Sequence, residues 1–294
     1  MSGLVVNEAF LSQVELLQTL IKNNVAGRFG GNHQSKTFGS SCDFADYRDY
    51  VPGDDITKID WNTFARFDKL YLKLYLDERQ VHTRIYIDAS RSMGYGKGKK
   101  DEQAIKIAAT LAYLSVCEMD KVSIYVIRDN HVEEIISDML GREAYYNNIG
   151  KLNDVVFDGD SLITEAILPS TVGYGDGLSI IISDFLTDND YETAIEHLAT
   201  KKRDVLCIQI LTKEELNPKV RGKMHFFDSE DSDKYYRKNI NREIIRAYKQ
   251  ALEYATGRIR DYCLSRGGQY MLVSSEDSLM EMFFDKLITM GVLK

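Results

Sequence analysis

The sequence predicts an α/β protein: a doubly wound, mostly parallel sheet with helices on both faces, preceded by an N-terminal helix and a small β-containing extension. Two observations carry this prediction. After residue 80, β-rich runs alternate with helical patterns to the end of the chain. The run Leu178–Ile182 is apolar throughout, which is typical of a strand covered on both faces. We therefore expect an N-terminal region at residues 1–80 and the main domain at residues 81–294.

The N-terminal region is predicted to begin with a helix and to end with a strand. Apolar residues recur at helical spacing through residues 7–24. Residues 27–41 are rich in glycine and polar residues, which favours a loop. The run Leu70–Leu76 has the alternation of a strand. Because a strand needs partners, we expect this region to pack on the main domain or to form a small β-subdomain.

In the main domain, strands and helices are predicted in alternation. Thr83–Ile87 reads as a strand, and Asp101–Met119 as a helix whose residues are apolar almost all round, which indicates deep packing against a sheet. The segment Arg128–His131 separates two strand patterns and predicts a hairpin. The other predicted elements are the strands Val122–Ile127, Val132–Ile136, Leu178–Ile182, Val205–Leu211 and Gln269–Val273 and the helices Tyr191–Thr200, Arg242–Ser265 and Asp277–Met290.

Composition narrows the classes of function. The formal net charge of −8 argues against nonspecific binding to nucleic acid or to an anionic membrane, because both favour a basic surface. No apolar run approaches the roughly 20 residues that span a bilayer, and the N-terminus lacks a signal-peptide layout. We therefore expect a cytoplasmic protein without membrane insertion. The four cysteines form no CxxC pair and are expected to be buried free thiols.

The stretch Asp88-Ala89-Ser90-Arg91-Ser92 follows the first predicted strand of the main domain. In open α/β sheets, ligands bind beyond the carboxyl ends of the strands, where this stretch falls. One acid and two hydroxyls at alternate positions can direct their oxygens to one point, and oxygen ligands select hard cations. A few protein ligands supplemented by water suit Mg²⁺. The residues Asp88, Ser90 and Ser92 therefore predict a magnesium site.

Two later segments supply further candidate ligands. Ser183-Asp184 closes the predicted strand Leu178–Ile182, so Asp184 falls at the same edge of the sheet. In the loop over residues 158–164, either Ser161 or Thr164 can offer a hydroxyl just before a helical segment. The predicted site thus draws on three separate segments of the chain.

Together these residues resemble the metal-ion-dependent adhesion site of von Willebrand factor A (vWA) domains. The resemblance implies that one ion, Mg²⁺ or alternatively Mn²⁺ or Ca²⁺, is surrounded by five residues: Asp88, Ser90, Ser92, Ser161 and Asp184. It also implies that the last coordination position is left for an acidic residue of a protein partner. Ser161 stands where the family has a threonine, and Asp160 adds an acid beside it.

A second resemblance lies upstream. The segment Arg48–Trp61, followed by Ala65-Arg66 and Tyr71-x-Lys73, is similar to the signature of a bacterial family catalogued as domain of unknown function 58. Members of that family carry a vWA-like domain after the signature, and many are encoded beside MoxR-type AAA+ ATPases. The resemblance therefore implies a MoxR-type AAA+ ATPase as a partner.

The signature block over residues 48–66 has two interpretations. In the first it is a docking surface for a partner. In the second it is a structural clasp in which Trp61 fills a core gap, Pro52-Gly53 makes a turn, and Arg48 or Arg66 pairs with Asp55 or Asp60. We favour the clasp, because acids beside arginines usually pair with one another.

Two basic segments are expected to be loops. Gly94–Lys100 lacks the spacing of a phosphate-binding loop, because Lys100 stands where the hydroxyl should be, and we expect a flexible basic loop beside the metal site. Lys234–Lys238 is basic and aromatic and is expected to be a loop before the long helix, since the chain as a whole is acidic.

Two functions from different classes are compatible with the acid at position 88. The first is a non-enzymatic, metal-dependent protein-interaction module that works as an adaptor with a MoxR-type ATPase. The alternative is a Mg²⁺-dependent phosphohydrolase of the haloacid-dehalogenase type, which also begins with an acid after the first strand. That chemistry needs a second Asp two residues later as the acid and base, and Ser90 occupies this position. We therefore expect no enzymatic activity.

Overall fold

The computed structural model describes residues 4–28, 44–75, 81–94, 98–172, 175, 177–219, 222–227 and 235–283. These residues divide into two compact units. The smaller lies between Lys22 and Gln80, and the larger comprises the described residues up to Ile21 and from Val81 onward. The expected boundary after residue 80 coincides with this division. The first helix, which we expected to belong to the N-terminal region, instead groups with the larger unit as far as Ile21.

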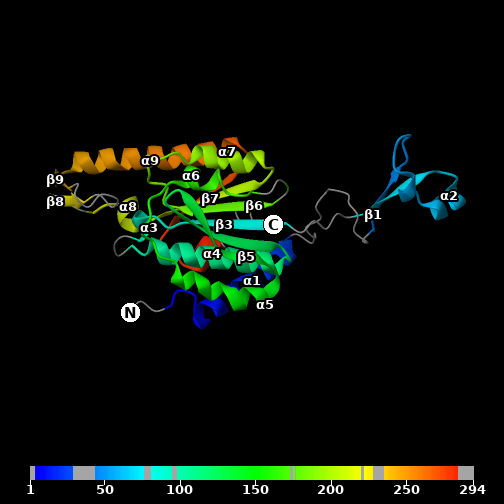
Figure 1. Cartoon of the computed structure of the whole chain (residues 1–294), viewed down its shortest axis with the longest axis horizontal. Helices are drawn as coiled ribbons and strands as arrows, with labels where there is room; N and C mark the ends of the chain where they lie inside the picture. Colours follow the sequence, from blue (N-terminus) through cyan, green and yellow to red (C-terminus); the bar gives the residue numbers. More distant parts are fainter. Residues whose placement is uncertain are drawn as a thin grey trace. The chain divides into compact units, whose positions relative to one another are not determined.

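The larger unit is built on a six-stranded sheet with the order β10-β7-β6-β3-β4-β5 (Figure 1). Parallel pairing joins all neighbouring strands except β4 and β5, which form the predicted hairpin. Chain order therefore runs outward from β3 in both directions, as in a doubly wound fold. The strands are β3 (His82–Asp88), β4 (Lys121–Arg128), β5 (His131–Met139), β6 (Leu178–Ser183), β7 (Asp204–Leu211) and β10 (Gln269–Ser274).

Helices cover both faces of this sheet, as Figure 1 shows. On one face lie α4 (Lys100–Cys117) and α5 (Gly141–Asn148), and on the other lie α6 (Ile163–Ile167), α7 (Glu192–Thr200) and α9 (Arg242–Ser265). Most residues of α4 are buried, which explains why its sequence is apolar almost all round. The α/β fold predicted from the sequence is thus confirmed.

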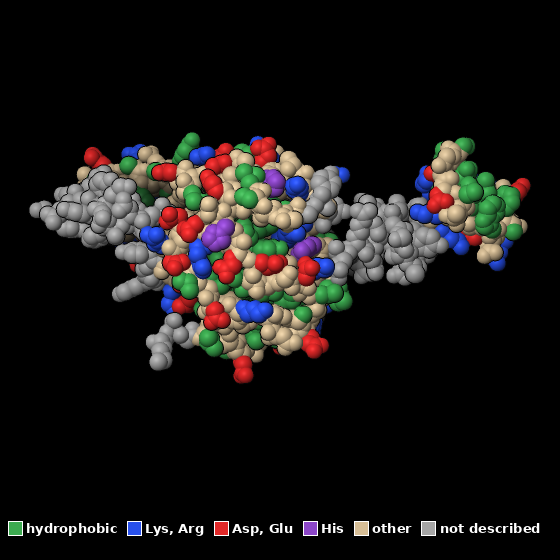
Figure 2. All heavy atoms as spheres, viewed as in Figure 1, with side chains coloured by type: hydrophobic (Ala, Val, Ile, Leu, Met, Phe, Trp, Pro, Cys, Tyr) green, Lys and Arg blue, Asp and Glu red, His purple; other side chains and the backbone are tan. Residues whose placement is uncertain are grey.

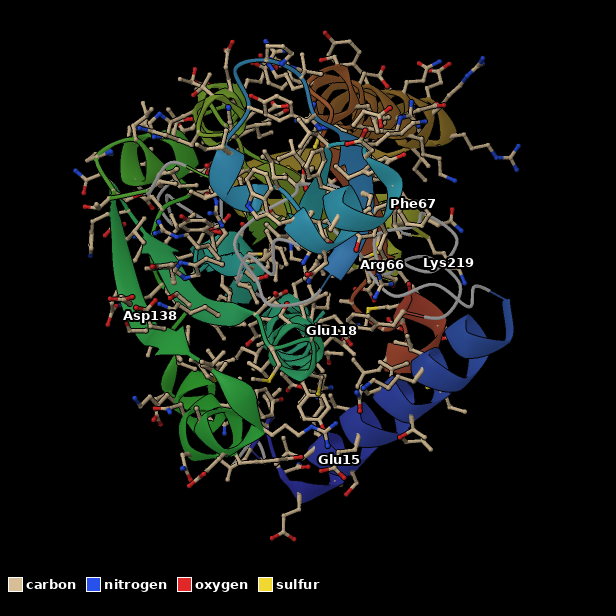
Figure 3. The ribbon with its side chains drawn as sticks, turned by 90° about the vertical axis from the view of Figure 1, so that its right-hand side faces the viewer. Glu15, Arg66, Phe67, Glu118, Asp138 and Lys219 are labelled. Carbon is tan, nitrogen blue, oxygen red and sulfur yellow. The ribbon has the colours of Figure 1, made fainter. Side chains whose placement is uncertain are left out.

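The first helix, α1 (Glu8–Arg28), buries Phe10, Val14 and Leu17. Just before the helix, the backbone of Val6 exchanges two hydrogen bonds with the Asn153 side chain, at 2.9 and 3.1 Å. Within the helix, Glu15 accepts a hydrogen bond from Tyr146 on α5; Figure 3 labels Glu15. These contacts explain why the helix belongs to the larger unit.

The smaller unit pairs β1 (Phe44–Asp49) antiparallel with β2 (Tyr71–Tyr75). Between them lie the short 3₁₀ helix η1 (Ile56–Lys58) and the helix α2 (Trp61–Phe67). The strand predicted at Leu70–Leu76 is confirmed over Tyr71–Tyr75, and Leu76 lies outside the described residues. The strand β1 and the helix α2 before it were not predicted. Figure 2 shows hydrophobic side chains on the surface of this unit, and Figure 3 labels Arg66 and Phe67 at the end of α2.

Several elements differ from expectation. Tyr235–Ile240 is a strand, β9, that pairs with β8 (Gly222–Phe227), so the prediction of a loop over the described residues 235–238 was wrong. Of the predicted final helix, residues 279–283 are helical and residues 284–290 lie outside the described ones. The predicted loop at 27–41 begins inside α1, and residues 29–41 lie outside the described part. Three short helices complete the fold: α3 (Arg91–Gly94), η2 (Ile149–Asp154) and α8 (Lys213–Leu216).

Two further findings concern the cysteines and the membrane. Cys207 and Cys263 are buried free thiols, as predicted, and Cys117 is a partly buried one. The remaining cysteine, Cys42, lies outside the described residues. Among the helices of the described residues, none combines the length and the apolar character needed to cross a bilayer.

Candidate metal centre

The predicted ligands come together at the carboxyl edge of the sheet. Asp88 ends β3, and Asp184 directly follows β6. These two strands are parallel neighbours, with Ile87 opposite Ile182, so both acids fall at the same edge. The loop carrying Ser161 is attached there by an isolated bridge between Ser90 and Gly159.

Asp88 is fully buried and is surrounded by neutral donors. Its Oδ2 accepts hydrogen bonds from the hydroxyls of Ser161, at 2.9 Å, and Ser183, at 2.5 Å. Its Oδ1 accepts a hydrogen bond from the backbone N–H of Ser90 at 3.0 Å. Burial and, secondarily, the negative charge of Asp184 raise the pKa of Asp88 to about 6. Among the described residues, the partners of Asp88 are hydroxyl and backbone N–H groups, and none is a cation.

The hydroxyls of Ser90 and Ser92 contact each other, and Ser161 is fixed separately. The Oγ atoms of Ser90 and Ser92 are 3.0 Å apart, at the start of α3. Ser161 is held through its carbonyl, which accepts a hydrogen bond from the Asn189 side chain at 3.0 Å. The other candidate in that loop, Thr164, instead accepts a hydrogen bond from the backbone N–H of Ala194 near the start of α7. Its hydroxyl thus serves a neighbouring helix.

Asp184 has a different environment, because a buried lysine lies against it. Its Oδ2 is 2.7 Å from the Nζ of Lys100, and its Oδ1 accepts a hydrogen bond from the backbone N–H of Leu186 at 3.1 Å. The same Nζ lies 2.9 Å from Oε1 of Glu215. Lys100 begins α4 and is only 3% exposed, so its predicted place in a flexible basic loop was wrong. Elsewhere in that segment, Gly94 ends α3 and residues 98–99 directly precede α4. Residues 95–97 lie outside the described ones.

These surroundings can be compared with the requirements of a metal ion. Within the described residues, no three His, Cys, Asp or Glu side chains are grouped so as to hold one. The Asp88 side of the site offers one carboxylate and the hydroxyls of Ser90, Ser92 and Ser161. Such an all-oxygen set fits a hard cation, and a buried carboxylate without a cationic neighbour fits a site that receives one. Asp184, in contrast, already has a cation against it, the Lys100 ammonium that it shares with Glu215.

Sequence reasoning missed three residues of this site. Ser183 was noted only as the neighbour of Asp184, although its hydroxyl contacts Asp88. Lys100 and Glu215 were not assigned to the site at all. Nothing local distinguishes Lys100 from Lys97 and Lys99, since each is a lysine in the same glycine-rich stretch.

The signature block departs from the expected clasp in two of its contacts. The ion pair of Arg48 that the structure describes is with Asp54, at 2.8 Å, and not with the predicted Asp55 or Asp60. A turn at Pro52-Gly53 is present, with Gly53 at a φ of 110°, where glycine is favoured. Trp61 is 60% exposed, so the expectation that it fills a core gap was wrong.

The strand order and the hydroxyl-flanked acid at the end of β3 define a vWA-like α/β domain. The family model described as "Protein of unknown function DUF58" matches residues 46–256, and the chain belongs to this family. Relatives include the uncharacterized proteins Rv1480 of Mycobacterium tuberculosis and Mb1516 of Mycobacterium bovis, each 22% identical over 202 residues. Those matches cover 66% of this chain and 63% of each relative.

Solved structures with some similarity to this chain come from several kinds of protein. The conserved hypothetical protein BatB from Bacteroides thetaiotaomicron has a TM-score of 0.40 at 16% identity, and the match covers 72% of this chain and 99% of BatB. The VWA domain of SpRpn10 has a TM-score of 0.37 at 9% identity, with 71% of this chain and 95% of that domain covered.

Proposed function

We propose that this protein is a non-enzymatic, metal-dependent protein-interaction module. In this proposal Asp88, Ser90, Ser92, Ser161 and Asp184 hold one Mg²⁺, and an acidic side chain of a partner completes the coordination. The observation that carries the proposal is the convergence of one buried carboxylate with serine hydroxyls from two separate segments. Mn²⁺ and Ca²⁺ are alternative ions, because both accept oxygen ligands.

Charge explains why such a site would favour an acidic partner. One carboxylate and three neutral hydroxyls leave a divalent ion with net positive charge. Asp184 removes less of this charge than an unpaired carboxylate would, because the Lys100 ammonium lies against it. The ion would therefore attract a carboxylate from outside, and it would also stabilise the ionised form of Asp88, which burial disfavours.

Binding is favoured over phosphoryl transfer by the residue at position 90. A haloacid-dehalogenase mechanism needs a second carboxylate there, whereas the Ser90 hydroxyl lies against that of Ser92. We expect no turnover of a generic phosphate ester in the presence of Mg²⁺. Robust hydrolysis that Asp88→Asn abolishes would contradict the non-enzymatic proposal.

Metal binding can be tested by titration calorimetry with Mg²⁺. We expect the parent protein to bind, Asp88→Ala to lose binding, and Asp88→Asn to be weakened because the amide keeps the shape but not the charge. Asp188→Ala is the matched control, since Asp188 is an exposed acid four residues after Asp184. Equal affinity in the parent and Asp88→Ala would defeat the proposal.

The partner we propose is a MoxR-type AAA+ ATPase, as the resemblance to the family implies, encountered in the cytoplasm. A pull-down between the tagged protein and the ATPase encoded in the same genome tests this. We expect the ATPase to be retained with Mg²⁺, and released by chelator or by Asp88→Ala. If neither chelator nor Asp88→Ala reduced the retention of the ATPase, the interface would lie elsewhere on the chain.

A further inference from the structure

Lys100 is the buried cation of this region. A buried ammonium is costly unless it is paired, and here two carboxylates, Asp184 and Glu215, lie within 2.9 Å of its Nζ. With two carboxylates at hydrogen-bond distance, the ammonium is a fixed positive charge at the carboxyl edge of the sheet.

The two acids predicted as metal ligands, Asp88 and Asp184, thus differ in whether a cation lies against them. Within the described residues, Asp88 meets hydroxyl and backbone N–H donors and forms no ion pair. Asp184 has an ammonium on one oxygen and a backbone N–H on the other. A metal ion that drew on Asp184 would have to share this carboxylate with Lys100, and two cations close together repel each other.

Lys100 also connects Asp184 to α8. Glu215 accepts the Lys100 hydrogen bond on Oε1, while its Oε2 accepts the backbone N–H of Thr212 at 2.6 Å. The Thr212 hydroxyl in turn accepts the backbone N–H of Glu215 at 3.0 Å, which closes a capping box at the start of α8. The segment before α4 packs there as well, since a Cβ at Gly98 would lie 2.2 Å from a methyl of Thr212.

We propose that Lys100 is an internal cation that competes with the metal ion for Asp184 and thereby lowers the metal affinity of the site. This inference rests on the proposed function, because it concerns the same site. Lys100 acts as a positioning residue: it keeps Asp184 turned toward Glu215 and α8. A metal ion that recruits Asp184 must displace the ammonium toward Glu215, which links occupancy of the site to the cap of α8.

Mg²⁺ titration of position-100 variants tests the competition. Lys100→Met removes the charge while keeping much of the side-chain volume, and we expect it to bind Mg²⁺ about tenfold or more tightly than the parent. Lys100→Arg keeps the charge and should retain the parent's affinity. The matched control is Lys99→Met, which changes the net charge equally but removes an exposed lysine paired with Glu102.

Folding must be separated from binding, because Lys100→Met leaves two carboxylates without their cation. A second pair of variants therefore carries Glu215→Gln, which leaves one carboxylate fewer beside position 100. The Mg²⁺ affinity of the Lys100→Met/Glu215→Gln double variant is compared with that of Glu215→Gln alone. Hydrogen exchange at residues 212–217 supplies a second readout: Mg²⁺ should reduce protection of these amides in the parent but not in Glu215→Gln.

The outcomes separate this inference from the proposed function. Tighter binding by Lys100→Met supports the inference even if the parent binds no Mg²⁺, in which case the proposed function of the parent fails alone. Equal Mg²⁺ affinity of Lys100→Met and the parent overturns the inference, whether or not both bind. A gain shared by Lys99→Met would also overturn it, because the effect would then be one of overall charge.

Discussion

The two units of this protein are stabilised in different ways. In the larger unit, the strands β3, β4, β6 and β7 and the helix α4 bury mainly apolar side chains along most of their length. In the smaller unit, among the side chains described from residue 46 to residue 73, only Ile59, Asp60 and Leu72 are buried. One of these three is an acid. The larger unit thus rests on apolar burial, and the smaller one on a hydrogen-bonded acid with little core around it.

Asp60 organises the smaller unit. It accepts hydrogen bonds from the hydroxyls of Tyr47, at 2.8 Å, and Thr63, at 2.9 Å, and from the backbone at the start of α2. Lys73 on β2 lies 3.4 Å from it. These donors, with Tyr47 first, hold the pKa of Asp60 well below its usual range. Asp60 thus ties β1 to α2 in a unit with few buried side chains, whereas Asp88 lies among the buried residues of the central sheet.

The largest expected effect comes from truncating one isoleucine in each unit. Ile124 on β4 is fully buried, and Ile124→Ala should lower the free energy of unfolding of the larger unit by about 2–5 kcal/mol. Ile59→Ala should leave that transition within about 0.5 kcal/mol, because Ile59 belongs to the other unit. Far-UV circular dichroism follows the larger unit, and fluorescence of the single tryptophan, Trp61, follows the smaller one. If either variant shifted both transitions equally, the two units would not be stabilised separately.

The next largest effect is expected from replacing Asp60, the buried acid of the smaller unit. Asp60→Asn should speed proteolysis within residues 44–75 severalfold and leave the larger unit's thermal transition unchanged, because it removes the charged acceptor of this hydrogen-bond cluster. Since the pKa of Asp60 is lowered, its stabilising contribution is present at neutral pH and is lost as the pH falls below its ordinary value of 3.8. Asp68→Asn is the control: Asp68 is exposed, and its φ of 53° suits asparagine. Similar proteolysis of both variants would remove the special role of Asp60.

A smaller effect is expected at His82, at the opposite end of β3 from Asp88. Burial, with the nearby charge of Arg84, lowers the pKa of His82 from 6.5 to about 4. Between these values the unfolded chain binds more protons than the folded one, so stability falls as the pH drops from 6.5 toward 4. His82→Gln should therefore lose less stability between pH 7 and pH 5 than the parent does, as measured by denaturant unfolding. An identical loss would show that His82 does not contribute to the acid sensitivity of the larger unit.

The smallest effect is expected at the exposed aromatic residues of α2. Trp61 and Phe67 are 60% and 68% exposed, so Phe67→Ser should change the free energy of unfolding of the smaller unit by no more than about 0.5 kcal/mol. Trp61 stays in place as the fluorescent probe. A change above 1 kcal/mol, on the scale of a buried residue, would mean that Phe67 is packed in solution and that this unit has more of a core than its side-chain exposure indicates.

Much of the fold could be read from local patterns. Strand and helix periodicity placed the six strands of the sheet, and α9 has the predicted bounds, Arg242–Ser265. β9 was missed because its basic, aromatic sequence becomes a strand only by pairing with β8. α2 was missed because it is a short helix whose start depends on the Asp60 cap.

For the site, local sequence patterns placed Asp88, Ser90 and Asp184 at the carboxyl edge, because they follow the ends of neighbouring parallel strands. The tertiary structure decided how each is used. It gave Asp88 neutral donors and Asp184 a lysine from the start of α4, and it assigned Thr164 to a neighbouring helix. The physical reason is that charge pairing depends on distances between atoms far apart in the chain, and residues 100, 184 and 215 share no local pattern that would reveal them as neighbours.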